Sequence, residues 1–289
     1  MKSLRAFIFI LFLAAIGHGN DADSRQGVDE ATEAQLQLGR AYLAGNGVAR
    51  DELKAFELFC KAATQGNAKA QNNLASMYAN GLGIARDLVE AATWYRRSAE
   101  QGAALAQTAL GTMLLRGNGI SKDCREAATW LRKAAEQGDP DAQLELGQLY
   151  HFGAEGVERD DAEAAKWLKM AAARGNAEAE NAMGVMCEDG LGVAQSQNEA
   201  AAWFEKAARK GDAKAQSNLG RCYALGAGLP RDLVKACQWL TAGAGQGEST
   251  AENLLTDLQR GLTPVQIAEA EQLAAREIAR LQEAKAAAK

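Results

Sequence analysis

The chain has 289 residues, of which 47% are hydrophobic and 24% charged, and its formal net charge is −5. This balance allows a buried core and excludes a mainly disordered chain. An acidic chain without clustered lysines and arginines is also a poor candidate for nucleic-acid binding, which depends on neutralising phosphates. Only three prolines interrupt a sequence rich in alanine, so we expect helices.

Residues 1–19 have the pattern of a cleaved signal peptide. A basic start precedes an apolar run from Ala6 to Ile16, and small or polar residues follow it. The run is too short to span a bilayer comfortably, which favours a cleaved export signal over a retained anchor. We therefore expect a periplasmic or secreted mature chain that starts with a polar lead-in, residues 20–31.

Residues 32–248 contain a block that recurs about every 36 residues. A glycine closes each block, and successive closing glycines lie 36 or 37 positions apart: Gly66, Gly102, Gly138, Gly175, Gly211 and Gly247. The longer step occurs in the fourth block, whose Gly-x-Gly turn is spread to Gly153 and Gly156. The pattern within each block predicts a helix, a glycine turn and a second helix, and such a period indicates a helical repeat protein.

The first helix of each block carries a glycine near its middle. This glycine follows the leucine or methionine of the core in five of the six blocks, at Gly39, Gly111, Gly147, Gly184 and Gly220. Glycine inside a helix costs about 1 kcal/mol relative to alanine. Its recurrence therefore predicts that a neighbouring helix passes very close to this position.

The second helix of each block begins at a residue that suits an N-cap, namely Asp51, Asp87, Asp123, Asp160, Ser196 or Asp232. Four blocks have glutamate three residues later and are predicted to form a capping box: Glu90, Glu126, Glu163 and Glu199. All five tryptophans occupy one further slot of this helix, at Trp94, Trp130, Trp167, Trp203 and Trp239. We interpret that slot as core packing, because an aromatic ligand site would not need to recur in every block.

Combined, these slots give Ala-x-x-x-Leu-Gly-x-x-Tyr, then Gly-x-Gly, then Asp-x-x-x-Ala-x-x-Trp, which resembles the Sel-one-like repeat family, a relative of the tetratricopeptide repeats. The resemblance covers six units within residues 32–248. It implies an all-α fold, a right-handed superhelical solenoid of antiparallel helix pairs that holds proteins together. Residues 249–284 are predicted to form C-terminal capping helices, because the last repeat would otherwise expose its core. Residues 285–289 are expected to fray.

The sequence offers little for catalysis. His151 is the only histidine after the signal peptide, and no Gly-x-Ser-x-Gly motif or metal-ligand spacing occurs. We therefore expect no enzymatic activity, cofactor or metal site. Five cysteines leave at least one thiol unpaired in an oxidising compartment. Cys222 and Cys237 lie on the two helices of one unit and are compatible with a disulfide, with buried free thiols as the alternative.

A partner-binding surface is predicted on the first helices, which usually line the concave side of such a solenoid. At 100° per residue, three slots of each first helix point away from its core slots. The predicted groove residues are Leu36, Arg40, Leu43, Asn72, Ser76, Thr112, Leu115, Leu144, Gln148, His151, Val185, Glu188 and Arg221. They vary in chemistry between units. This variation fits a surface adapted to one partner, and it equally fits a surface without a binding role. Arg40 and Arg221 are predicted to anchor carboxylates of the partner.

These observations predict a non-catalytic protein-binding scaffold or adaptor. Three partner classes fit the family resemblance: an envelope complex, the ectodomain of a sensor, or a toxic effector against which the chain acts as an immunity protein. The alternative is a hydrolase that acts on cell-wall fragments or β-lactams, since some family members have been described in that way. A purely structural spacer is a third interpretation.

Overall fold

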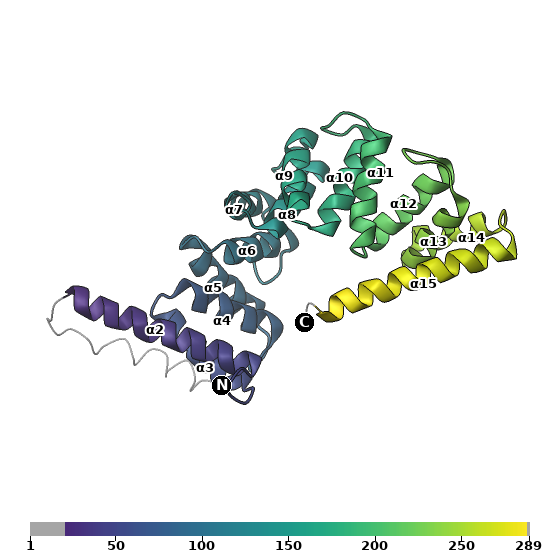
Figure 1. Ribbon diagram of the computed structural model, residues 1–289. Coiled ribbons are helices and arrows are strands. Elements are labelled where there is room, and N and C mark those ends of the chain that lie inside the picture. The colour runs from purple at the N-terminus through teal and green to yellow at the C-terminus, as the bar shows by residue number, and fades with distance from the viewer. Residues whose placement is uncertain (1–20, 288–289) are drawn as a thin grey trace. The chain divides into compact units, whose positions relative to one another are not determined.

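The computed structural model describes residues 21–287, and the chain divides into two compact units, residues 1–87 and 88–289. The predicted signal peptide lies outside the described residues. The first unit contains α2 (Asp21–Ala44), α3 (Glu52–Thr64) and α4 (Ala68–Asn80) (Figure 1). The second contains α5 (Leu88–Glu100), α6 (Ala104–Arg116), α7 (Cys124–Glu136), α8 (Pro140–Phe152), α9 (Asp161–Ala173), α10 (Ala177–Asp189), α11 (Gln197–Arg209), α12 (Ala213–Leu225), α13 (Leu233–Ala244), α14 (Ser249–Gln259) and α15 (Pro264–Ala287).

The helices form the predicted repeat solenoid. Within the second unit, successive helices from α5 to α13 pack against one another, so the repeat pairs are stacked in chain order (Figure 1). The first helix starts two residues after each closing glycine, and the second follows the glycine turn, as the sequence predicts. The expected lead-in belongs largely to α2, which begins at Asp21. Among residues 21–287, no helix combines the length and hydropathy needed to span a bilayer.

The predicted N-caps are confirmed at Asp51, Asp123, Asp160, Ser196 and Asp232, whereas the return half of the capping box is wrong at Asp123, Asp160 and Ser196. The carboxylates of Asp123 and Asp160 accept the backbone N–H of Glu126 at 2.8 Å and of Glu163 at 3.0 Å. Each cap's own N–H, however, already donates to a carbonyl in the last turn of the preceding first helix, as from Asp160 to Tyr150 at 2.8 Å. The glutamate is therefore released from capping, and its carboxylate is available for contacts between repeats.

The close approach predicted at the mid-helix glycines is confirmed. A Cβ placed on Gly111 would lie 2.7 Å from Leu131 Cγ of α7, and one placed on Gly147 would lie 2.7 Å from Leu168 Cγ of α9. Leu131 is fully buried and Leu168 is 2% exposed. The missing side chain thus lets the second helix of the same repeat insert a large apolar residue at this point.

The tryptophan slot lies partly in the core and partly at its edge. Trp167 and Trp239 are buried, as predicted, while Trp94, Trp130 and Trp203 are half-buried. Lysine Nζ lies 4.2 Å from the ring centroid of Trp130 and 4.0 Å from that of Trp203, where it covers the face left open. The next residue along the helix, rotated by about 100°, is the one that faces the glycine. That slot holds large side chains that are at most 2% exposed: Phe59, Leu131, Leu168, Phe204 and Leu240.

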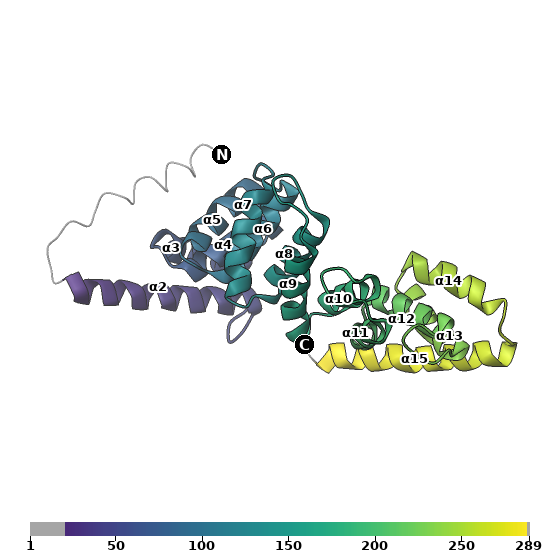
Figure 2. The same ribbon diagram turned by 90° about the horizontal axis from the view of Figure 1, so that it is seen from above.

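The C-terminal cap covers more than the last repeat. α15 packs along α13 (Figure 2), and Ala270 and Ala274 are buried. Further along the same helix, Leu281 lies against Gly211 and the Arg280 guanidinium donates to the Arg209 carbonyl, both at the end of α11. One long helix therefore shields the ends of two successive repeats. It continues to Ala287, into the tail expected to fray.

All five cysteines are free thiols. The disulfide considered for Cys222 and Cys237 is therefore not formed, and the two thiols are buried, at 1% and 0% exposed, as the alternative has it. Burial raises the pKa of the Cys222 thiol to about 11, and it also raises the pKa of Cys237. Both side chains serve as small apolar groups in the core of the last repeat.

Candidate partner-binding surfaces

Two of the predicted groove residues belong to the core instead. Leu36 is fully buried and Leu144 is 8% exposed, so neither is available to a partner. Each lies three residues before the mid-helix glycine, and residues three apart share one helical face. That face packs against the second helix of the repeat, as the contact between Gly147 and Leu168 shows. The predicted groove slots were those that point away from the other core slots of the helix. The face that carries the glycine was not recognised as buried.

The remaining groove residues of the first unit stay at least partly accessible. Arg40 is exposed, and Leu43, Asn72 and Ser76 are half-buried. Leu38 was predicted to be a core residue, yet it is 43% exposed. Later first helices bury one face against the preceding repeat. The described residues contain no repeat before α2, so the corresponding face of α2 is exposed.

In the second unit, the predicted groove residues form a row of polar contacts between adjacent first helices. Gln148 of α8 donates to Glu178 of α10 at 2.8 Å. Arg221 of α12 donates to both carboxylate oxygens of Glu188 of α10, at 2.8 and 2.6 Å. Arg221 was predicted to be an open anchor for a partner's carboxylate, whereas the structure shows that Glu188 already occupies it. Thr112, Leu115 and Val185 are half-buried beside these pairs.

His151 has a structural environment. Its Nδ1 lies 2.8 Å from Asp161 Oδ1, so it ties the last turn of α8 to the first turn of α9. The Arg159 guanidinium binds the other Asp161 oxygen at 2.7 Å. Hydrogen bonds from Arg159 and then from His151 lower the pKa of Asp161. The histidine therefore closes the turn between α8 and α9.

Sequence analysis missed a chain of buried amides that joins the repeats. Gln107 donates from Nε2 to the Ala99 carbonyl of the previous repeat at 3.1 Å, and its Oε1 accepts from Gln137 at 2.8 Å. In the fifth repeat the same two positions hold Glu180 and Lys210, whose charged groups lie 2.8 Å apart. The recurring slot, Gln71, Gln107, Gln143, Glu180 and Gln216, was visible in the sequence. Polar residues usually lie on the surface, so this slot was not expected in the core, although its members are at most 5% exposed.

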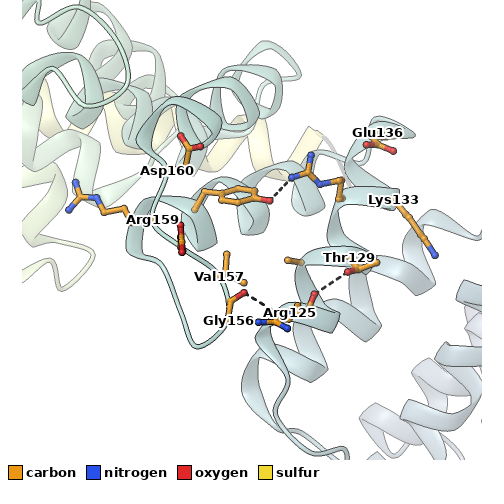
Figure 3. A pocket seen from close by; sticks show the side chains of 12 residues that line it. Arg125, Thr129, Lys133, Glu136, Gly156, Val157, Arg159 and Asp160 are labelled. Carbon is orange, nitrogen blue, oxygen red and sulfur yellow. Dashed lines mark hydrogen bonds between the residues drawn. The ribbon is translucent and has the colours of Figure 1, made fainter.

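A pocket that sequence analysis also missed lies between α7 and the turn that joins α8 to α9 (Figure 3). Its volume is about 530 Å³. Arg125 and Arg132 line it from α7, and Tyr150 and Val157 line it from the fourth repeat. Figure 3 shows Arg125 meeting Gly156 at one end, while Lys133 and Arg159 extend away on opposite sides. The only sequence signal was the longer step of the fourth block.

Comparisons with known proteins agree with this architecture. Six consecutive segments match the Sel1 repeat, at residues 32–67, 68–102, 104–139, 140–176, 177–212 and 213–248. Among solved structures, a Sel1 repeat protein from Oxalobacter formigenes is 38% identical with a TM-score of 0.68, and the alignment covers 79% of this chain. The alignment spans 66% of that protein, just under two thirds of its length.

Two other solved structures are similar at lower scores. The protective antigen c5321 of uropathogenic Escherichia coli, which displays an SLR fold, is 29% identical with a TM-score of 0.41, over 90% of this chain and 73% of that one. The immunity protein PA5088 of Pseudomonas aeruginosa is 22% identical with a TM-score of 0.46, over 85% and 94% of the two chains. Among curated proteins, none matches.

Proposed function

Since the chain belongs to the Sel1 repeat family, we propose that it is a non-catalytic scaffold of the periplasm or secreted space, which holds a partner protein on the first helices of its repeats. The export part of this proposal is supported by the signal-peptide pattern of residues 1–19. N-terminal sequencing of the protein recovered from a periplasmic fraction tests it. A mature chain that still begins at Met1 would contradict cleavage.

The observation that carries the binding role is one slot repeated on four successive first helices. It holds Thr112, Gln148, Val185 and Arg221, and all four are half-buried. The mid-helix glycine directly before each of these four residues belongs to the same rigid framework, which the buried glutamine chain also braces. Such a framework presents chemically different groups at a fixed spacing, which suits the recognition of an extended partner surface.

The partner remains one of three classes: an envelope complex, a sensor ectodomain or a toxic effector. Each predicts a different companion in affinity capture from an envelope extract. A sensor or an assembly component comes from the cell's own envelope, while an immunity role predicts that the captured effector kills cells that lack this protein. Growth of a deletion strain that expresses the captured partner separates the last class from the other two.

A substitution in the row tests the site. Gln148→Lys keeps a donor for Glu178, so the helix contact survives while the surface charge changes. Gln272→Lys on the exposed face of α15 is the matched control. We expect the row variant to lose the captured partner and the control to retain it, with equal helical circular dichroism. Equal capture by both variants would contradict the proposed site, and the absence of any specific partner for the wild type would contradict the scaffold role.

A further inference from the structure

The turn of the fourth repeat is built differently from its counterparts in the second unit. In the third, fifth and sixth repeats, the residue after the first turn glycine donates its N–H back to the first helix, as from Asn118 to the Met113 carbonyl at 3.0 Å. In the fourth repeat, Ala154 and Val157 instead exchange two hydrogen bonds of 2.9 Å within the turn. Gly153 has φ 66° and ψ 167°, a conformation that is essentially restricted to glycine.

The second glycine of this turn lacks the close contact with the backbone of the preceding repeat that its counterparts make. A Cβ on Gly119, Gly192 or Gly228 would collide with the backbone carbonyl of the first residue of the preceding repeat's second helix. A Cβ on Gly156 would meet only the Arg125 side chain, 3.2 Å away at Nε. The extra residue, Glu155, therefore lifts the turn from α7, and the Arg125 guanidinium enters the space that backbone fills elsewhere. The pocket lies at the site of this single insertion.

The pocket carries positive groups that the protein leaves without carboxylate partners. Arg159 is paired with Asp161, and Lys133 lies over the Trp130 ring. Within the described residues, Arg125 contacts only the Gly156 carbonyl at 3.5 Å among polar groups, and Arg132 donates to the Tyr150 hydroxyl. Neither guanidinium takes part in an ion pair in that part of the chain.

The pocket also has an apolar wall. Val157 is 9% exposed and packs with Cys124 and Leu149, while Ala128 lies on α7 beside the two arginines. Three acidic residues also line the pocket, Glu136, Glu158 and Asp160; all are exposed, and Asp160 accepts the backbone N–H of Glu163 as the N-cap of α9. Two guanidiniums without carboxylate partners beside an apolar wall suit a carboxylate that is followed by an apolar side chain, because guanidinium binds carboxylate through paired hydrogen bonds.

We propose that this pocket binds an acidic segment of a partner protein, with Arg125 and Arg132 pairing the carboxylate of an aspartate or glutamate. The proposal rests on the scaffold role and adds to it a second contact point on the second helices. A volume of about 530 Å³ falls in the range of specific ligand pockets. It accommodates a few residues, so the pocket recognises a short segment and the row of first helices contacts the rest.

The test is a selection of displayed random nonapeptides on the full mature protein. We expect enrichment of peptides with an aspartate or glutamate beside an apolar residue. A synthetic peptide from the enriched pool should bind Arg125→Ala/Arg132→Ala about tenfold more weakly or worse, since hydrogen bonds to charged groups are of this strength. It should bind the control Lys214→Ala/Arg276→Ala, which removes the same charge from exposed positions, without change.

Deletion of Glu155 tests the origin of the pocket. The deletion restores the turn length of the other repeats, so Gly156 should settle on α7 and close the pocket, and the peptide should no longer bind. Glu155→Ala removes the same charge, keeps the turn length and should bind normally. If the deletion variant does not fold, the binding measurement on Arg125→Ala/Arg132→Ala is the test of the pocket.

Enrichment without acidic residues, failure to enrich any peptide, or equal binding to the arginine variant and the wild type would overturn the proposal. If the protein still captures a partner that is sensitive to Gln148→Lys, only the pocket assignment fails. If no partner is captured by any form of the protein, the scaffold role itself is wrong.

Discussion

The glycine in the middle of the first helices makes a prediction whose sign can be tested. Gly111→Ala removes a helix-weakening glycine, which by itself would stabilise the protein by about 1 kcal/mol. The new methyl, however, would lie 2.7 Å from Leu131 Cγ, 2.9 Å from its Cδ2 and 3.3 Å from the Ala127 carbonyl oxygen. Both neighbours are fully buried, so relief requires repacking. Overpacking of this kind costs about 1–3 kcal/mol, and we expect a net loss of about 1 kcal/mol.

A second substitution reverses the expected sign. Leu131→Ala alone should cost about 2–5 kcal/mol, because it empties a buried site. In that background the two closest opposing atoms are gone and only the Ala127 carbonyl oxygen remains at 3.3 Å, so Gly111→Ala should stabilise by up to about 1 kcal/mol. Urea unfolding followed by far-UV circular dichroism on the four proteins measures the cycle. Stabilisation by Gly111→Ala in both backgrounds would refute the close-packing explanation for the glycine.

Three further predictions follow from the described contacts. Lys210→Ala should lower the free energy of unfolding by about 1–3 kcal/mol, because it leaves the buried Glu180 carboxylate without its ion-pair partner. The double variant Glu180→Gln/Lys210→Gln should lie within about 1 kcal/mol of the wild type. Equal losses for both variants in urea unfolding would contradict the pairing. Thiol titration in denaturant without reductant should give five groups per chain, and in the folded state Cys222 should stay unreactive near neutral pH because its pKa is about 11. A count of three groups in denaturant would show that one disulfide is present and would contradict the free thiols. The pKa of Asp161 is lowered in the folded state, so its stabilisation is present above the unfolded value of about 3.9 and is lost as the pH falls through the folded value. Thermal unfolding of Asp161→Asn should lie below the wild type at pH 7, and the gap should narrow as the pH is lowered through the acid range; a gap that does not change with pH would oppose this.

The repeat frame could be predicted because its signals are local. An N-cap acts on the next three residues, and a turn glycine acts on its own backbone, so Asp123 and Gly119 define boundaries without knowledge of neighbours. The close approach at Gly111 could be inferred because glycine inside a helix is costly and needs a compensating contact. The helix pairs, their order and the C-terminal cap followed from such signals.

The candidate site was harder to predict, because it depends on contacts between repeats. Arg221 looked like an open anchor until Glu188 of the preceding first helix was placed beside it. Leu36 looked like surface because the helical face it shares with Gly39 was not counted as buried. The pocket depended on a single inserted residue, Glu155, whose effect appears only once the turn is seen against α7. Polar recurrence, as at Gln107, deserves the same weight as apolar recurrence in such proteins.

Site-specific photo-crosslinking in living cells tests the central claim most directly. A photoreactive phenylalanine derivative replaces Gln148 on α8 in one strain and Gln272 on α15 in another. The scaffold account predicts a discrete protein adduct from position 148 and none from position 272. Adducts from position 272 alone, or no adduct from position 148 while the protein is folded and exported, would contradict a partner held on the first helices.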